Sequence, residues 1–282
     1  MLSQMQQRIL DWYTSRARPL GWRRTSDPYA ILVSEIMLQQ TQVARVEPAW
    51  RAFLARFPSV RALASAPLAD VLTAWRGLGY NRRAVSLHRC ATAIVQLHSG
   101  VVPDDLLALR ALPGIGDYTA RAVLAFAFGL PAAPVDTNVA RVLARLVAGR
   151  PLGKPETQRI ADGFLGFSDP ATWSHALMDF GAAVCTARAA KCHECPLAGT
   201  CAWRGEGPDP AAVGAYRPRP QGRFMGSDRY HRGRLVDALR TGPVPRAGLT
   251  RATGSVDAER IAGLLVSEGL AEWHGETLRL PS

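Results

Sequence analysis

Between about residues 2 and 183, hydrophobic residues recur every three or four positions, and short turns rich in proline, glycine and aspartate separate the runs. This spacing places apolar side chains on one face of each of a series of helices. The pattern therefore predicts an all-α fold without internal repeats. The expected helices cover about residues 3–16, 28–44, 45–56, 59–65, 68–75, 81–98, 104–110, 117–129, 137–148, 156–164 and 170–183.

The last quarter of the chain has a different pattern. A segment rich in proline, glycine and arginine within residues 206–228 is typical of a linker. Residues 229–282 predict short helices, the clearest at Ala258–Leu270, followed by a strand, a turn and a strand in LAEWHGETLRL. The sequence thus predicts a helical domain (1–184), a cysteine-rich loop (185–205), a linker (206–228) and a small winged-helix-like module (229–282).

Composition and charge narrow the class of protein. Of the 282 residues, 48% are hydrophobic and 20% charged, which suffices for a sizeable core and argues against a disordered chain. The net charge of +11 favours a polyanionic partner, although an arginine-rich protein need not bind nucleic acid. Lysine occurs only at Lys154 and Lys191. The polar N-terminal stretch predicts neither a signal peptide nor a membrane anchor, so we expect a cytoplasmic, nucleoid-associated protein.

Four of the five cysteines lie close together, at Cys185, Cys192, Cys195 and Cys201, separated by six, two and five residues. Four thiolates suit either zinc or an iron–sulfur cluster. Structural zinc usually takes two separated close pairs, whereas this segment has one close pair and two wider arms, which favours a [4Fe–4S] cluster. Cys90 falls within a predicted helix and is expected in the core.

The segment LPGIGDYTA interrupts the helical pattern with two glycines, Gly114 and Gly116. Glycines allow a tight turn, and the free amides at the start of the next helix attract a phosphate oxygen. Such a contact positions nucleic acid without reading its sequence. An ordinary connection between helices would have the same spacing.

Two carboxyl groups are candidates for chemistry. Asp136 precedes the apolar run TNVARVLARL, where it could cap a helix or stabilise positive charge on a bound sugar. Glu35 lies among Ile31, Leu32 and Ile36, so it is expected to be partly buried, although a solvated face would also accept it. Burial without a cation raises a carboxyl pKa, and a protonated glutamate can act as a general acid. Two carboxyls in these roles would suit cleavage of a glycosidic bond.

Five ordered motifs carry a resemblance to a known family. They are SEIMLQQTQV, WRGLGYNRRA, LPGIGDYTA, VDTNVARVL and the 6-2-5 cysteine spacing. Over about residues 5–205 the chain resembles the helix–hairpin–helix DNA glycosylases, and within them the MutY-type adenine glycosylases. The resemblance implies a two-lobed helical domain, a [4Fe–4S] cluster and removal of adenine mispaired with 8-oxoguanine or guanine in double-stranded DNA. The target base must leave the stack before its glycosidic bond can be reached.

The resemblance also implies roles for individual residues. Glu35 would protonate N7 of adenine, and Asp136 would stabilise the cationic sugar, with Tyr118 and Asn138 beside them. The base pocket would include Trp22, Arg23, Leu38 and His175, the last in a place where Gln or Glu is usual. DNA would be held by Gln40, Thr41, Leu78, Gly79, Tyr80, Gly114 and Gly116.

Two departures bear on the activity. Relatives of the endonuclease III type have a lysine nucleophile where Tyr118 stands, and neither lysine is near this motif, so the resemblance favours a monofunctional enzyme. We also expect a monomer. MutY-type proteins usually also have a Nudix-like domain, in place of which this chain has the small C-terminal module. One alternative is a thymine or uracil glycosylase acting on mismatches with guanine. Another is a non-catalytic iron–sulfur DNA-binding regulator.

Overall fold

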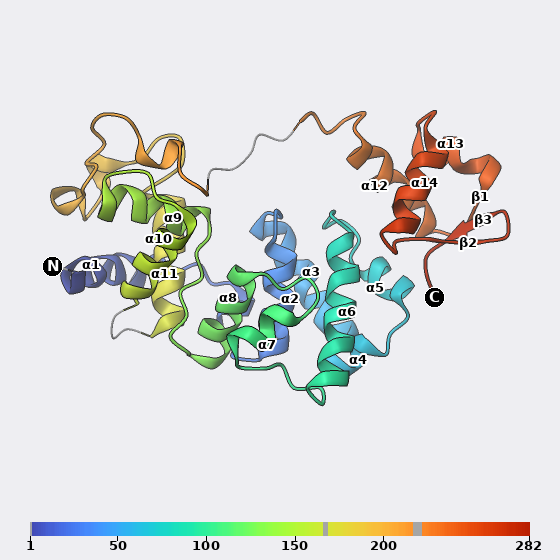
Figure 1. Cartoon of the computed structure of the whole chain (residues 1–282), viewed down its shortest axis with the longest axis horizontal. Coiled ribbons are helices and arrows are strands. Elements are labelled where there is room, and N and C mark those ends of the chain that lie inside the picture. The colour runs from blue at the N-terminus through green and yellow to red at the C-terminus, as the bar shows by residue number, and fades with distance from the viewer. Residues whose placement is uncertain (1, 166–168, 217–221) are drawn as a thin grey trace. The chain divides into compact units, whose positions relative to one another are not determined.

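The computed structural model describes residues 2–165, 169–216 and 222–282, and the chain is predominantly helical (Figure 1). The helices of the first two thirds are α1 (Leu2–Thr14), α2 (Pro28–Leu38), α3 (Val43–Arg56), α4 (Val60–Ala64), α5 (Leu68–Ala74), α6 (Arg82–Leu97), α7 (Leu106–Ala111), α8 (Asp117–Phe128), α9 (Thr137–Val142), α10 (Lys154–Gly163) and α11 (Pro170–Ala183). This confirms the predicted all-α class. No helix of the described segments is long and apolar enough to cross a membrane.

The chain forms two compact units. Unit 1 comprises Met1–Ile31, Asp104–Leu106 and Gly116–Pro220, and unit 2 comprises Leu32–Pro103, Leu107–Ile115 and Gln221–Ser282. The expected helical domain thus contributes residues to both units. The C-terminal module belongs to the same unit as α3–α6.

Unit 1 has its core between α1, α9, α10 and α11. α11 begins where Asp169 accepts a hydrogen bond from the amide of Thr172 (2.7 Å), so the sequence itself fixes this helix start. Trp12 meets the ring of Phe180 edge-on, with centroids 5.3 Å apart. These contacts bring the N-terminal helix onto α11 and leave the cysteine segment, after Ala183, on the same unit.

Unit 2 has a helical core in which Trp75 and Phe53 are almost completely buried. Their rings are 5.9 Å apart at 85°, a favourable edge-to-face arrangement. The C-terminal module of this unit contains α12 (Asp228–Leu239), α13 (Leu249–Thr253) and α14 (Ala258–Ser267). Its antiparallel sheet has the order β1-β3-β2, with β1 at Val244–Pro245, β2 at Glu272–His274 and β3 at Thr277–Arg279. The predicted strand, turn and strand are therefore present.

One expected helix is wrong in its extent, and another differs in type. The single helix expected at residues 28–44 ends at Leu38, and α3 starts at Val43, because Gln40 adopts a left-handed φ of 57°. The helix expected at residues 137–148 has that extent, but its second half, η2 (Leu143–Ala148), is a π-helix that ends at Gly149, with φ 62°. The wider turn leaves the carbonyl oxygens of Arg145 and Leu146 to accept hydrogen bonds from the amides of Trp203 and Ala202, both at 3.0 Å.

Candidate active site

The predicted hairpin glycines occupy the connection between α7 and α8. Gly114 has a φ of 78°, and a Cβ atom there would lie 2.7 Å from that of Ser86. Only glycine meets both constraints. Gly116 is exposed and is the N-cap residue of α8, whose first turn contains Asp117 and Tyr118. The turn between the two helices is therefore formed as the sequence predicts, and the start of α8 is exposed.

Glu35 lies in the apolar middle of α2 and has only 4% of its surface exposed. Its neighbours in the helix, Ser34 and Ile36, are also buried. The partial burial expected from the sequence is thus confirmed, and the solvated face is excluded. Glu35 is therefore an ionisable group buried within an apolar helix.

Arg83 ties the end of the Glu35 helix to the GLGY turn. Its side chain is buried, and burial lowers the pKa of its guanidinium to about 10, so it remains charged at neutral pH. The guanidinium lies 5.5 Å from the ring centroids of both Trp75 and Tyr80. Its nitrogens donate hydrogen bonds of 2.5–3.1 Å to six acceptors, namely the carbonyl oxygens of Ile36, Met37, Gln39, Leu78 and Gly79 and the hydroxyl of Thr41.

The residues expected to hold DNA differ in exposure. Tyr80 is 41% exposed, with a left-handed φ of 45°, and Gln40 and Gly79 are also exposed. Left-handed φ values cost a non-glycine residue on the order of 1–3 kcal/mol and cluster at functional sites. Thr41 and Leu38 are half-buried, but Leu78 is 3% exposed. Of the residues expected to hold DNA, Gln40, Gly79 and Tyr80 are therefore exposed, whereas Leu78 is buried.

Both carboxylate oxygens of Asp136 accept hydrogen bonds within unit 1. One carboxylate oxygen accepts from the amide of Val139 (2.7 Å), which caps α9, and the other accepts from Asn138 Nδ2 (2.8 Å). Burial raises the pKa of Asp136, and these two hydrogen bonds oppose the shift. Arg141 in turn donates to Asn138 Oδ1 (2.7 Å) and to the carbonyl of Cys185 (2.7 Å). The carboxylate is therefore held in one orientation.

Two of the expected pocket residues of unit 1, Arg23 and His175, interact with a buried carboxylate, Asp179. Arg23 donates to it at 2.7 and 3.0 Å, and Arg18 does so at 2.8 Å. These bonds hold the pKa of Asp179 below its ordinary value although burial acts in the opposite direction. His175 stacks on Phe126, with centroids 4.2 Å apart. Burial, assisted by the Arg23 cation, lowers the pKa of His175 to about 3, so its imidazole is neutral.

Two other predicted site residues belong to unit 1. Trp22 is buried, with 5% of its surface exposed, in a short 3₁₀ turn, η1 (Gly21–Arg23). Tyr118 is half-buried in the first turn of α8. Both are thus placed on elements with regular hydrogen bonding rather than on loops.

The four clustered cysteines are half-buried on the segment after α11. Amides of Leu197 and Arg204 donate to the sulfurs of Cys195 and Cys201, both at 3.4 Å. Burial raises the pKa of Cys195 to about 11, and the negative charges of the other three cysteines act in the same direction. Among the described residues, however, no group of three or more His, Cys, Asp or Glu side chains is arranged to hold a metal ion.

Arg145 supports the first of these cysteines. Its side chain is 3% exposed, donates to Asp209 (2.6 and 2.9 Å) and lies 3.6 Å from Cys185 Sγ. Amide donors and a nearby cation favour the thiolate form of a cysteine. Cys90 has the opposite environment: it is fully buried in α6, and burial raises the pKa of its thiol to about 12.

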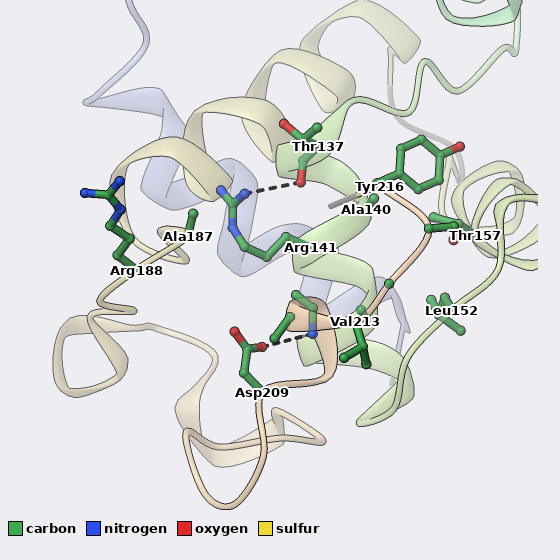
Figure 2. Close-up of a pocket in the computed structure, with 15 residues that line it drawn as sticks. Thr137, Ala140, Arg141, Leu152, Thr157, Ala187, Arg188, Asp209, Val213 and Tyr216 are labelled. Carbon is green, nitrogen blue, oxygen red and sulfur yellow. Dashed lines mark hydrogen bonds between the residues drawn. The ribbon is translucent and has the colours of Figure 1, made fainter. Parts of the chain in front are cut away.

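A separate cavity of about 650 Å³ lies against α9 in unit 1. Figure 2 shows Arg141 beside it, donating to the carbonyl of Thr137 (3.2 Å), and Asp209 accepting from the amide of Ala211 (3.0 Å). The carboxylate of Asp209 is also bonded to Arg145. None of the described residues that line the cavity is one of the predicted catalytic residues Glu35, Tyr118, Asp136 and Asn138.

The sequence did not predict three residues that hold predicted site residues in place: Arg83, Arg141 and Asp179. Each of them has at least one partner more than 40 residues away in the chain. Arg83 follows a turn rich in glycine, whose backbone carbonyls need hydrogen-bond donors. This is the one local signal that could have pointed to Arg83. The pairing of Arg23 with Asp179 had no such signal.

Comparison with known proteins decides the family. A model of the HhH-GPD superfamily of base excision DNA repair proteins matches residues 33–164. An adenine DNA glycosylase of Mycolicibacterium smegmatis is 46% identical over 273 residues, covering 94% of this chain and 91% of that protein. The chain belongs to the adenine DNA glycosylase family. An adenine DNA glycosylase of Mycobacterium tuberculosis is 45% identical over 272 residues, covering 93% of this chain and 88% of that protein.

The solved structures extend the comparison to the fold. The structure of a thermostable thymine-DNA glycosylase aligns with a TM-score of 0.67 and 28% identity, covering 72% of this chain and 96% of that one. The two mycobacterial adenine DNA glycosylases align with 94% and 93% of this chain, more than the 72% covered by the solved structure. At 94% coverage, the M. smegmatis alignment necessarily includes most of the C-terminal module.

Proposed function

We propose that the protein removes adenine mispaired with 8-oxoguanine or guanine in double-stranded DNA, by hydrolysing the N-glycosidic bond after the base has been flipped out of the helix. The observation that carries this proposal is the buried carboxyl of Glu35, in a chain 46% identical to an adenine DNA glycosylase. The net charge of +11 supports DNA as the partner.

The proposed chemistry uses two carboxyls in different protonation states. Glu35 donates its proton to N7 of adenine, so the base leaves as a neutral molecule. Asp136 in its ionised form stabilises the positive charge that develops on the sugar and orients the attacking water. The hydrogen bonds from Val139 and Asn138 favour that ionised form, although burial raises the pKa of Asp136.

The base pocket in this proposal uses Trp22, Arg23, Leu38 and His175. A neutral imidazole has one donor and one acceptor nitrogen, and adenine presents both kinds of group. The low pKa of His175 supports its use in this neutral form. Asp179 fixes Arg23 rather than touching the base, since two arginines already occupy its oxygens.

The proposed enzyme is monofunctional and leaves an abasic site. Strand cleavage by the Schiff-base route needs an amine nucleophile at the sugar. Tyr118 stands at the place of that lysine, and the two lysines of the chain lie in exposed positions at the start of α10 and in the cysteine segment. We also propose that the protein acts as a monomer at the nucleoid.

Cys185, Cys192, Cys195 and Cys201 are proposed to hold a [4Fe–4S] cluster, which would organise this segment of unit 1. We expect the purified protein to be brown and to contain about four irons per chain. In the matched pair, Cys192→Ser should lose iron, whereas Cys90→Ala, which changes the buried thiol of α6, should retain it. A colourless protein with stoichiometric zinc, or equal iron in the two variants, would contradict the assignment.

The substrate is tested with four duplexes that contain A opposite 8-oxoguanine, A opposite guanine, A opposite cytosine and T opposite guanine. We expect free adenine from the first two, and strand breakage at the site only after treatment with alkali. Breakage without alkali would contradict a monofunctional enzyme. Release of thymine from the fourth duplex, with no adenine released, would favour the thymine glycosylase instead.

Two observations weigh against the alternatives. The thymine-DNA glycosylase is 28% identical, well below the two mycobacterial adenine glycosylases, and a pyrimidine lacks the N7 that Glu35 would protonate. A non-catalytic DNA-binding regulator would have no use for a buried acid. Such a binder would retard the duplexes in a gel without releasing any base.

A further inference from the structure

Unit 2 exposes a small group of large apolar side chains near the GLGY turn. Phe224 is 55% exposed and Met225 59% exposed, on a turn that immediately precedes α12. Tyr80 and Phe224 are the exposed aromatic side chains of the described residues. Adjacent exposed apolar side chains mark an interaction surface more often than isolated ones do.

Arg229 connects the two aromatic rings. It donates to the hydroxyl of Tyr80 (3.4 Å) and to the carbonyl of Gly222 (3.0 Å), and its guanidinium lies 5.8 Å from the Phe224 ring centroid. Tyr230 packs edge-on against Phe224, with ring centroids 5.8 Å apart and an interplanar angle of 89°. Rings interleaved with guanidinium groups are typical of surfaces that stack nucleic-acid bases.

Helix α12, which contains Arg229 and Tyr230, is fixed at both ends. At its start, Asp228 forms a bidentate ion pair with Arg260, both contacts at 2.8 Å. At its end, Arg240 is buried and donates to the carbonyl of Leu72 and to Asn81 Oδ1, both at 2.9 Å. Phe224 and Met225 are thus presented in a set position beside the turn, which lowers the entropic cost of binding.

We propose that Gly222–Tyr230, the C-terminal arm, is a second DNA-contacting element that continues the surface of the Tyr80 turn. Phe224 and Met225 stack against a base of the duplex that flipping has unstacked, and Arg223 and Arg229 contact the neighbouring phosphates. The inference rests on the proposed function, because that function brings DNA to Tyr80.

Charge favours DNA over a protein partner at this surface. From Pro210 to Ser227 the chain has no aspartate or glutamate but includes Arg217, Arg219 and Arg223, and the one acidic residue of the arm, Asp228, is already paired with Arg260. A run of one sign next to exposed aromatic groups complements a polyanion with stackable bases. The module therefore extends the DNA-binding surface beyond the hairpin glycosylase motifs.

The test uses the full chain and a fluorescent duplex that contains A opposite 8-oxoguanine, with dissociation constants measured at several salt concentrations. We expect Phe224→Ala combined with Met225→Ala to weaken binding by about 5- to 100-fold without changing the salt slope, because stacking is lost but no phosphate contact is. Arg223→Ala should instead lower the salt slope by about one. Phe224→Trp should bind like the unmodified chain.

The matched control is Val256→Ala, which removes a 95% exposed apolar side chain elsewhere in the same module. Binding by the double variant as tight as by this control would overturn the inference, and the surface would then be assigned to a partner other than DNA. Thermal unfolding checks that the variants fold. Adenine release by the unmodified chain at saturating concentration is measured separately, so a failure of the proposed function is distinguished from a failure of the arm.

Discussion

Glu35→Gln is expected to bind the A–8-oxoguanine duplex normally but to release adenine about 10²- to 10⁴-fold more slowly, the usual contribution of a general acid. Glutamine has nearly the same shape and can occupy the same buried position in α2, but it has no acidic proton for N7. Single-turnover kinetics with enzyme in excess isolates base release from product dissociation.

Two further variants make this expectation specific. Glu35→Asp keeps an acid but shortens its reach, so base release should be partly retained. Glu47→Gln removes a half-buried carboxylate of α3 that pairs with Arg51 at 2.7 Å, and it should leave the rate unchanged. If Glu35→Gln released adenine as fast as Glu47→Gln, the role of Glu35 as the acid would be refuted.

The sequence could predict the elements whose causes are local. α11 was expected at residues 170–183 and is found there, because Asp169 supplies its cap and the apolar spacing its buried face. α8 starts at Asp117 after the two glycines, as expected. The capping role of Asp136 and the burial of Glu35 likewise follow from neighbours within a few positions.

The errors occur where a distant residue decides the backbone. The expected helix over 28–44 breaks at Gln39–Thr41. There Arg83 donates hydrogen bonds to the carbonyl oxygen of Gln39 and to the hydroxyl of Thr41, which a continuous helix would not place within its reach. η2 adopts its wider turn where the cysteine segment docks. Hydrophobic periodicity carries no information about such pairings, since donor and acceptor are separated by 40 residues or more.

Because Arg83 holds these backbone segments, its replacement is expected to lower the free energy of unfolding strongly. Arg83→Met keeps an unbranched apolar stem but removes every donor, leaving buried carbonyls around the GLGY turn without their partner. Each such group costs about 1–3 kcal/mol, so we expect the free energy of unfolding of unit 2 to fall by about 3 kcal/mol or more. Arg83→Lys should recover part of this loss, because a lysine retains the charge but only three donors.

The neighbouring arginine supplies the control. The side chain of Arg82 is 71% exposed and lies 3.9 Å from Glu268, and an exposed pair of this kind contributes about 0–1 kcal/mol. Arg82→Met should therefore unfold close to the unmodified chain in a thermal or urea titration.

Hydrogen exchange separates a local effect from a general one. Because Arg83 holds Gln39–Thr41 and Leu78–Gly79 together, its loss should raise exchange first at the amides of these two segments, before the core around Trp75 opens. Binding of the mismatched duplex should weaken in parallel, since the Tyr80 ring loses the guanidinium against which it packs. Equal stability and exchange in Arg83→Met and Arg82→Met would show that the turn holds its shape without Arg83, and its left-handed residues would then need another support.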